Sequence, residues 1–223
     1  MVDTMSSALT VVADIPKETL DLYLKSDAIA MDTELQGLRL QRDQVCLVQM
    51  ADRNQNVCLV RPKAGACPNL TRLLTDSNTL KVFHYALVDV AFLRRSLGIT
   101  VNNFACTKVM SKLVRTYASY HSLKELVNEL VGIKLEKENQ QTNWSAASLT
   151  PEQTVYAAND VLHLLKVYDG LKKMVHERGA LPSGITADQL NVLCQSFLPT
   201  LVELILNGYG DADNGWVTSL FTH

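Results

Sequence analysis

The chain of 223 residues predicts an α/β domain with a mixed sheet, followed by further helices. Short apolar runs typical of buried strands dominate the first third of the sequence. Amphipathic segments with helical spacing follow them, and clear helix start and stop signals mark the second half. This order of strands, a helix, another strand and then helices is the basis of the prediction.

The strands are expected where the apolar runs are short and bounded by polar residues. Residues 28–31 form the first run, which ends at Asp32. Residues 45–50 and 57–60 are two further runs separated by a polar turn, so an antiparallel meander should follow the first strand. Residues 80–84 predict one more strand.

Apolar spacing predicts helices over residues 68–76, 87–97, 107–117 and 121–131. Gly98 and Gly132 follow two of these segments, and glycine tolerates the left-handed conformation that commonly ends a helix. The clearest helix begins at Thr150, which forms a capping box with Gln153 and is expected to continue to about Arg178.

The predicted organisation has three parts: an N-terminal segment (1–26), the α/β domain (27–178) and a C-terminal extension (179–223). The extension contains a linker and a last helix over 187–206, and it is irregular after Asn207. Packing, an oligomer contact or completion of the site are its expected roles.

Composition excludes several functional classes. Hydrophobic residues make up 47% and charged residues 20%, as in an ordinary globular protein. Lys plus Arg is 21, Asp plus Glu is 23, and the net charge is -2. Proteins that coat long nucleic acid by charge alone are usually strongly basic, so this balance argues against that class and leaves a short or metal-bridged nucleic-acid ligand open.

The sequence favours a soluble, cytoplasmic protein. Its five cysteines are scattered without a CxxC pair, which fits a reducing compartment. No basic residue precedes Lys17, so a signal peptide is not expected. The best candidate membrane span, 196–205, contains Pro199 and Glu203 and is shorter than the ~20 residues required, so no membrane partner is expected.

Acidic residues from three predicted elements can converge. Asp32 and Glu34 lie two residues apart where the first strand is expected to end, so both carboxylates share one face. Asp89 lies on the helix that the strand over 80–84 delivers to the same sheet end. Tyr156 and Asp160 are four residues apart and share one face of the long helix.

Clustered carboxylates resist joint ionisation unless a cation compensates them. Divalent Mg²⁺ or Mn²⁺ prefers oxygen ligands, and two such ions about 4 Å apart stabilise the attacking and leaving oxygens of phosphodiester cleavage. A tyrosine can orient or help to deprotonate the attacking water. Each residue alone also has a structural explanation: a turn for Asp32, a helix N-terminal charge for Asp89, core packing for Tyr156.

The contexts of these residues resemble the three motifs of DEDD exonucleases. Residues 31–34 (Met-Asp-Thr-Glu) resemble the first motif, 82–90 the second, and 156–161 the third in its tyrosine form. Between them, residues 122–126 and 132–144 are similar to the intermediate block of ribonuclease D-like proteins. The chain therefore resembles a DEDDy 3′–5′ exonuclease over the predicted α/β domain.

This resemblance implies a ribonuclease H-like fold and two divalent cations, Mg²⁺ or Mn²⁺. It implies that Asp32 bridges both ions, that Glu34 and Asp160 bind the nucleophile-side ion, and that Asp89 supports the other. Tyr156 would position the nucleophilic water near Glu34. The products would be nucleoside 5′-monophosphates released from a 3′ end.

Residues 106–117 and the pair Gly215–Trp216 look closer to the NrnC-type nanoRNases. That group implies very short RNA substrates, notably diribonucleotides, and homo-octameric rings. A dinucleotide has one linking phosphodiester, which metal ions neutralise without a basic channel. Asn143 and the Ala-Ala-Ser run at 146–148 depart from the ribonuclease D pattern, which weakens any transfer of its substrate contacts.

Several residues outside the acidic set are candidate substrate contacts. Leu35 and Leu38 would wedge between bases or stack on one, although core packing explains them as well. His84, at a strand end, would contact a terminal phosphate or a carboxylate, unless the backbone satisfies it. His121 lies in the matched block and is a candidate ligand of a 5′ phosphate.

Lys108, Lys112 and Arg115 are spaced three to four residues apart and predict one basic helix face. Such a face either meets phosphate or is simply solvated. Trp144 would line the nucleotide pocket or a subunit contact, because tryptophan stacks on bases and is enriched at interfaces.

Three functions are compatible with the sequence. The first is a metal-dependent exoribonuclease for very short RNA. The second is a general ribonuclease D-like enzyme that trims longer RNA or single-stranded DNA. The third is a non-catalytic nucleic-acid-binding module, which the full set of acids and the tyrosine disfavours. Substrate length, RNA or DNA preference, physiological metal and oligomeric state stay open.

Overall fold

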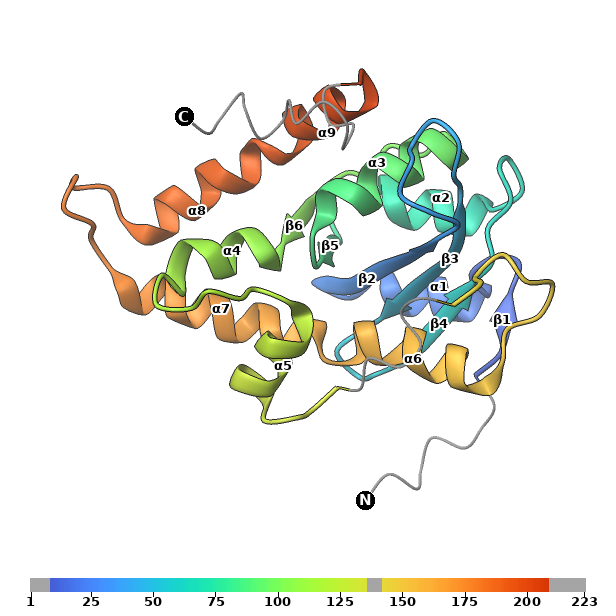
Figure 1. Cartoon of the computed structure of the whole chain (residues 1–223), viewed down its shortest axis with the longest axis horizontal. Helices are drawn as coiled ribbons and strands as arrows, with labels where there is room; N and C mark the ends of the chain where they lie inside the picture. The colour runs from blue at the N-terminus through green and yellow to red at the C-terminus, as the bar shows by residue number, and fades with distance from the viewer. Residues whose placement is uncertain (1–8, 136–141, 209–223) are drawn as a thin grey trace.

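The computed structural model describes residues 9–135 and 142–208, so Gly215 and Trp216 lie outside the described residues (Figure 1). The strands are β1 (Val11–Val12), β2 (Ala28–Leu35), β3 (Val45–Ala51), β4 (Val57–Val60), β5 (Leu80–Phe83) and β6 (Phe104–Cys106). The helices are α1 (Lys17–Tyr23), α2 (Pro68–Thr75), α3 (Ala86–Leu97), α4 (Thr107–Val114), α5 (Leu123–Val131), α6 (Pro151–Leu162), α7 (Leu164–Arg178), α8 (Ala187–Ser196) and α9 (Leu198–Leu206).

The described strands form one mixed sheet in the order β1-β4-β3-β2-β5-β6. The predicted antiparallel meander is confirmed, because β3 pairs antiparallel with both β2 and β4. β5 continues the sheet in parallel on the other side of β2, followed by β6, and β1 pairs in parallel with β4. The α/β architecture with a mixed sheet is therefore as the sequence predicts.

Alternation along β2 divides the interior into two layers. Ile29 and Met31 face the main core, which α1, α2 and α3 cover. Ala28 and Ala30 face the opposite layer, where side chains of α6 and α7 pack against the sheet. Asp32 continues the second series, so the strand itself turns that carboxylate toward α6.

The helical half of the molecule has a core of its own. Side chains of α4, α5 and α7, with Ala187 of α8, form a separate buried cluster beside the sheet. Figure 1 shows α4, α5 and α7 grouped next to the edge formed by β5 and β6. Within this group, Thr107 of α4 contacts the end of β5, because its hydroxyl donates to the carbonyl oxygen of Phe83.

Several boundaries differ from the sequence prediction. β2 continues to Leu35, because its pairing with β3 extends from Ala30 to Leu35. The helix expected over 150–178 is two helices that meet at His163. The change of direction follows the sheet, since α6 packs on β2, β3 and β4 whereas α7 packs on β2 and β5. The helix expected over 107–117 ends at Val114.

The sequence analysis also missed short elements. β1, β6 and α1 have two, three and seven residues, so each is too short for its apolar spacing to be recognised in the sequence. The two capping glycines are confirmed, since Gly98 and Gly132 both adopt the left-handed conformation. The capping box of Thr150 and Gln153 is also present.

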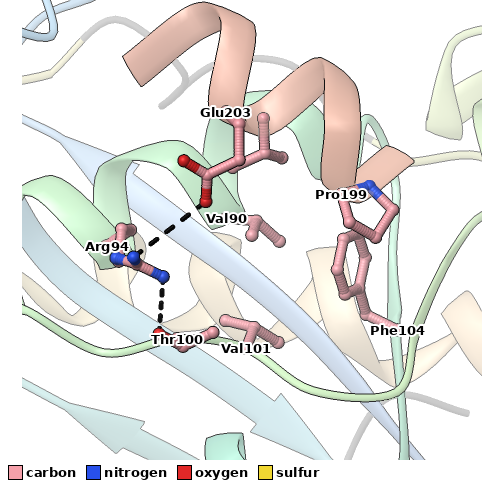
Figure 2. Close-up of a pocket in the computed structure, with 8 residues that line it drawn as sticks. Val90, Arg94, Thr100, Val101, Phe104, Pro199 and Glu203 are labelled. Atoms are coloured by element: carbon pink, nitrogen blue, oxygen red, sulfur yellow. Dashed lines mark hydrogen bonds and ion pairs between the residues drawn. The ribbon is translucent and has the colours of Figure 1, made fainter. Parts of the chain in front are cut away.

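The last predicted helix divides at Phe197 into α8 and α9, with Pro199 in the first turn of α9. Figure 2 shows α9 lying against α3, where Arg94 donates to Thr100 Oγ1 at 2.6 Å and its Nη2 lies 4.0 Å from Glu203 Oε1.

Ala187–Leu206 as a whole has 20 residues and is apolar enough for a membrane span by length and composition alone. That corrects the expectation that no segment approaches this length.

Candidate active site

The end of β2 projects beyond its neighbour on one side. Pairing between β2 and β5 stops at Met31 and Phe83, whereas pairing with β3 continues to Leu35. The last four residues of β2 therefore have a described strand beside them only on the β3 side. Ligands of α/β proteins commonly bind at such carboxyl ends of parallel strands.

The chain turns sharply from β5 into α3 at this place. Tyr85 precedes the helix with a φ of 74°, in the left-handed region that non-glycine residues seldom occupy. The turn allows α3 to begin directly beside the projecting end of β2, with Asp89 in its first turn. Lys108 Nζ lies 4.1 Å from the centroid of the Tyr85 ring.

Three carboxylates meet where the sequence predicted convergence. Asp32, Glu34 and Asp160 each offer one oxygen, and these oxygens lie within 4.8 Å of one another. β2 supplies the first two from one face, and α6 crosses that face to supply the third. The described residues thus contain a set of oxygen donors suited to a hard divalent cation.

Asp89 lies beside this group from the opposite layer. Its Oδ1 accepts a hydrogen bond of 2.6 Å from Thr33 Oγ1, and its side chain is buried. Thr33 separates Asp32 from Glu34 on β2, so the strand contacts α3 with one face and α6 with the other. We call Asp32, Glu34, Asp89 and Asp160 together the acidic site.

The electrostatics of the acidic site favour a bound cation. Burial and mutual repulsion raise the pKa of Asp32 well above its usual range and raise that of Glu34 to about 9. Burial raises the pKa values of Asp89 and Asp160 to about 7 each, although hydrogen bonds from Thr33 and Tyr156 oppose the shift. Carboxylates held this way are stabilised by a positive ion, so the donor set fits a metal.

Tyr156 lies one helical turn before Asp160, so the two side chains share one face of α6. Burial, and then the nearby carboxylates, raise the pKa of its phenol above the ordinary value. Trp144 packs behind it, with ring centroids 6.1 Å apart. Trp144 is only 4% exposed, and its place in a nucleotide pocket or a subunit contact stays a prediction.

Gln49 is a residue of this region that the sequence analysis missed. It lies on β3 directly opposite Asp32, and its Nε2 is 3.4 Å from Asp32 Oδ2 and 3.3 Å from Glu34 Oε1. A single polar residue within the apolar run 45–50 was the available signal.

The two candidate histidines lie side by side with hydroxyl groups of α4. His84 Nδ1 is 2.9 Å from Thr107 Oγ1, so a hydroxyl rather than the backbone satisfies that nitrogen. Burial lowers the pKa of His84 to about 4. His121 Nδ1 is 2.8 Å from Ser111 Oγ. Both imidazoles are therefore held by α4, next to the turn that carries Tyr85.

The predicted basic face is only partly present. Lys112 is exposed and Lys108 is half-buried over Tyr85. Arg115 lies beyond the end of α4, is 3% exposed, and forms a short ion pair with Glu129 on α5. The guanidinium of Arg115 thus joins α4 to α5, and its role as a phosphate contact stays a prediction.

The two candidate leucines separate as well. Leu35 is half-buried and packs against the main core, which agrees with the explanation by core packing. Leu38 is 82% exposed in the loop after β2, so core packing does not explain it. Leu38 is the more exposed of the two, and both stay predicted substrate contacts.

The 3′–5′ exonuclease family matches residues 12–176 of the chain. Among curated relatives, the ribonuclease D of Cronobacter turicensis is 32% identical over 164 residues, which are 73% of this chain and 44% of that protein. The chain thus spans less than half the length of the ribonuclease D proteins that it matches.

Solved structures match over a larger share of both chains. Brucella melitensis NrnC bound to pGG is 36% identical, with a TM-score of 0.81 over 91% of this chain and 95% of that one. The same protein with bound Mg²⁺ is 35% identical, with a TM-score of 0.80 and the same coverage. The expected ribonuclease H-like exonuclease fold is confirmed, and the chain belongs to the 3′–5′ exonuclease family.

Proposed function

We propose that the protein is a metal-dependent 3′–5′ exoribonuclease that hydrolyses very short RNA, including diribonucleotides, to nucleoside 5′-monophosphates. The observation that carries the proposal is the meeting of Asp32, Glu34 and Asp160 within 4.8 Å at the projecting end of β2. Similarity to NrnC bound to the dinucleotide pGG, over nearly the whole of both chains, supports the short substrate.

The acidic site would hold two divalent cations, Mg²⁺ or Mn²⁺. Asp32 would lie between them, Glu34 and Asp160 would bind one, and Asp89 would support the other from α3. Bound cations stabilise the attacking and leaving oxygens of phosphodiester hydrolysis. The NrnC structure with Mg²⁺ supports this choice of ion.

Tyr156 would act as an orienting group for the attacking water. A tyrosine phenol with the ordinary pKa of about 10 is protonated at neutral pH, so it would serve as a hydrogen-bonding hydroxyl. The contact with Asp160 fixes the hydroxyl next to the carboxylates. Trp144, packed behind the ring, limits its movement.

Substrate binding is proposed for the side chains around the turn at Tyr85. Leu38 is exposed and would contact a base. Lys108, with the imidazoles of His84 and His121 held by α4, would face a terminal phosphate, and exposed Lys112 would add charge nearby. A dinucleotide needs few such contacts, which agrees with the near-neutral charge of the chain.

We also propose that the protein is a homo-oligomer in which α8 faces a second copy. Val192, Leu193 and Phe197 are between 49% and 66% exposed. Large apolar residues grouped on a monomer surface commonly mark an interface. The family resemblance points to an octameric ring, and sedimentation as a monomer at micromolar concentration would refute the proposal.

A general RNA-trimming activity is the second candidate, since a curated relative with 32% identity is a ribonuclease D. RNA substrates of two, three, five and about ten nucleotides, 5′-labelled and incubated with Mn²⁺ or with a chelator, separate the two. We expect the dimer to be cleaved fastest and only with metal. An efficient ladder on the longest RNA would favour trimming, and no cleavage of any length would refute both.

A further inference from the structure

We propose that Gln49 is a positioning residue for the metal ligands: its side-chain amide holds Asp32 and Glu34 so that one oxygen of each faces a divalent cation. The inference rests on the proposed metal-dependent activity but not on substrate length. It concerns a side chain on β3, which carries none of the recognised acidic motifs.

The sheet register places Gln49 opposite the two acids. Its Cα pairs with that of Asp32, and Glu34 lies two residues further along the same face of β2. The side chain is completely buried. Position and burial therefore leave the amide little freedom to turn away from the carboxylates.

The side-chain nitrogen of Gln49 donates a hydrogen bond to each of the two carboxylates. Nε2 lies 3.4 Å from Asp32 Oδ2 and 3.3 Å from Glu34 Oε1, and an amide group has two N–H donors. Reversing the amide would replace both donors by its carbonyl oxygen, which cannot donate to a carboxylate. The contacts with the two acids thus fix which way the amide points.

The carbonyl oxygen of the Gln49 amide is in an unfavourable environment. Gln49 Oε1 is buried and has no hydrogen-bond partner among residues 9–135 and 142–208. A buried carbonyl without a partner is unfavourable, so packing alone would select an apolar residue here. The donation to the acids is the one polar role that the described contacts assign to this side chain.

The contacts divide the oxygens of the two acids. Oδ2 of Asp32 and Oε1 of Glu34 face the amide, and each carboxylate keeps further lone pairs for a cation. Mg²⁺ requires nearly ideal octahedral geometry, so its affinity depends on how rigidly the ligands are oriented. Groups that hydrogen-bond to metal ligands commonly change affinity or activity by about 10- to 100-fold when they are removed.

The test compares Gln49→Met with the wild-type protein in Mn²⁺ titrations by calorimetry and in RNA hydrolysis at increasing Mn²⁺. Methionine preserves the length of the side chain and removes both donors. We expect the Mn²⁺ dissociation constant to rise by about 10-fold or more. Hydrolysis should recover to within about threefold of wild type when Mn²⁺ is saturating.

Met50→Ala is the matched control, because Met50 is the next residue on β3 and its side chain belongs to the main core. It should lower the melting temperature without changing the Mn²⁺ dissociation constant. Should Gln49→Met not fold, Gln49→Asn keeps the amide but withdraws it by one methylene, and several-fold weaker Mn²⁺ binding is expected.

Unchanged Mn²⁺ affinity in a folded Gln49 variant would overturn the inference. So would a loss of hydrolysis that saturating Mn²⁺ does not restore, since Gln49 would then act on the reaction itself. Wild-type protein that binds Mn²⁺ but cleaves no RNA would refute the proposed function, while the calorimetric comparison would still test Gln49.

Discussion

Two groups of charged side chains in this molecule have opposite electrostatics. At the acidic site, burial and repulsion raise the pKa values of the carboxyl groups. Between α4 and α5, Arg115 and Glu129 compensate each other, which lowers the pKa of Glu129 and raises that of Arg115. Tyr117 adds a 2.6 Å hydrogen bond to Glu129. The second group balances its own charges, whereas the first requires an external cation. We therefore assign a structural role to the Arg115–Glu129 pair and a functional role to the acidic site.

Asp160→Asn should have the largest effect on activity and none of the usual cost in stability. Removing a ligand of a metal that supplies several kcal/mol of transition-state stabilisation should reduce RNA hydrolysis by about 1000-fold or more. The same change removes one of the repelling charges, so metal-free protein should melt at a higher temperature than wild type. Steady-state hydrolysis with Mn²⁺ and thermal melting with a chelator measure the two effects.

Glu177→Gln is the control for that substitution. Glu177 is exposed near the C-terminal end of α7, a helix that carries no residue of the acidic site. Its Oε1 lies 3.7 Å from Lys173 Nζ. Hydrolysis and melting temperature should stay at wild-type values. Undiminished hydrolysis by Asp160→Asn would contradict the assignment of the acidic site.

Glu129→Gln should affect the molecule in the opposite sense. It leaves the Arg115 guanidinium buried without its charge partner, which should lower the free energy of unfolding by about 2 kcal/mol because Glu129 itself is partly exposed. Hydrolysis per folded molecule should be unchanged. Chemical denaturation measures the first quantity, and a neutral or stabilising result would show that the two charge groups do not differ as described.

The pH dependence of stability should distinguish the acidic site from the rest of the protein. Its folded pKa values, about 7 for Asp89 and Asp160 and about 9 for Glu34, exceed the ordinary values of 3.8 and 4.5. The folded state therefore binds more protons than the unfolded state between about pH 4 and pH 9. The contribution of these groups to the free energy of unfolding is fully present below this range. It is lost as pH rises, by up to about 1.4 kcal/mol per pH unit for each proton.

Other groups act in the opposite direction at the ends of this range. The pKa of His84 is lowered to about 4 and that of Lys81 to about 8. Melting of metal-free wild type and Asp160→Asn should therefore be compared between pH 7 and 8, where the difference isolates the acidic site. The wild-type melting temperature should fall more steeply with pH, and equal slopes would contradict the cause assigned to the raised pKa values.

The smallest effects are expected at the two leucines after Glu34. Leu38→Ala removes an exposed side chain, so stability should change by less than about 0.5 kcal/mol while cleavage of the RNA dimer falls several-fold. Leu35→Ala should lower stability by about 1–2 kcal/mol, because Leu35 packs against the core. If Leu38→Ala leaves the KM for the dimer unchanged, the base contact is wrong.

Sequence reasoning was most successful where a local pattern decides the structure. The spacing of Asp32 and Glu34 on a strand, and of Tyr156 and Asp160 on a helix, is enough to place each pair on one face. Capping signals such as Thr150 act locally in the same way. These features needed no knowledge of distant contacts.

The features that sequence reasoning missed depend on partners far along the chain. Gln49 has meaning only through its register with Asp32. Arg115 follows the helical spacing of two exposed lysines, but its pairing with Glu129 removes it from the surface. The break at His163 arises because α6 and α7 follow different strands of a twisted sheet, and no glycine or proline marks it.

A single Mn²⁺ titration of the wild-type protein at pH 8 tests the central claim most directly. Thermal melting and hydrolysis of an RNA dinucleotide are followed in the same samples. If the acidic site is completed by a cation, both should rise over the same Mn²⁺ range, with a stabilisation of about 2.7 kcal/mol at one hundred times the dissociation constant. Hydrolysis that persists in chelator, or a melting temperature that Mn²⁺ does not change, would contradict the claim.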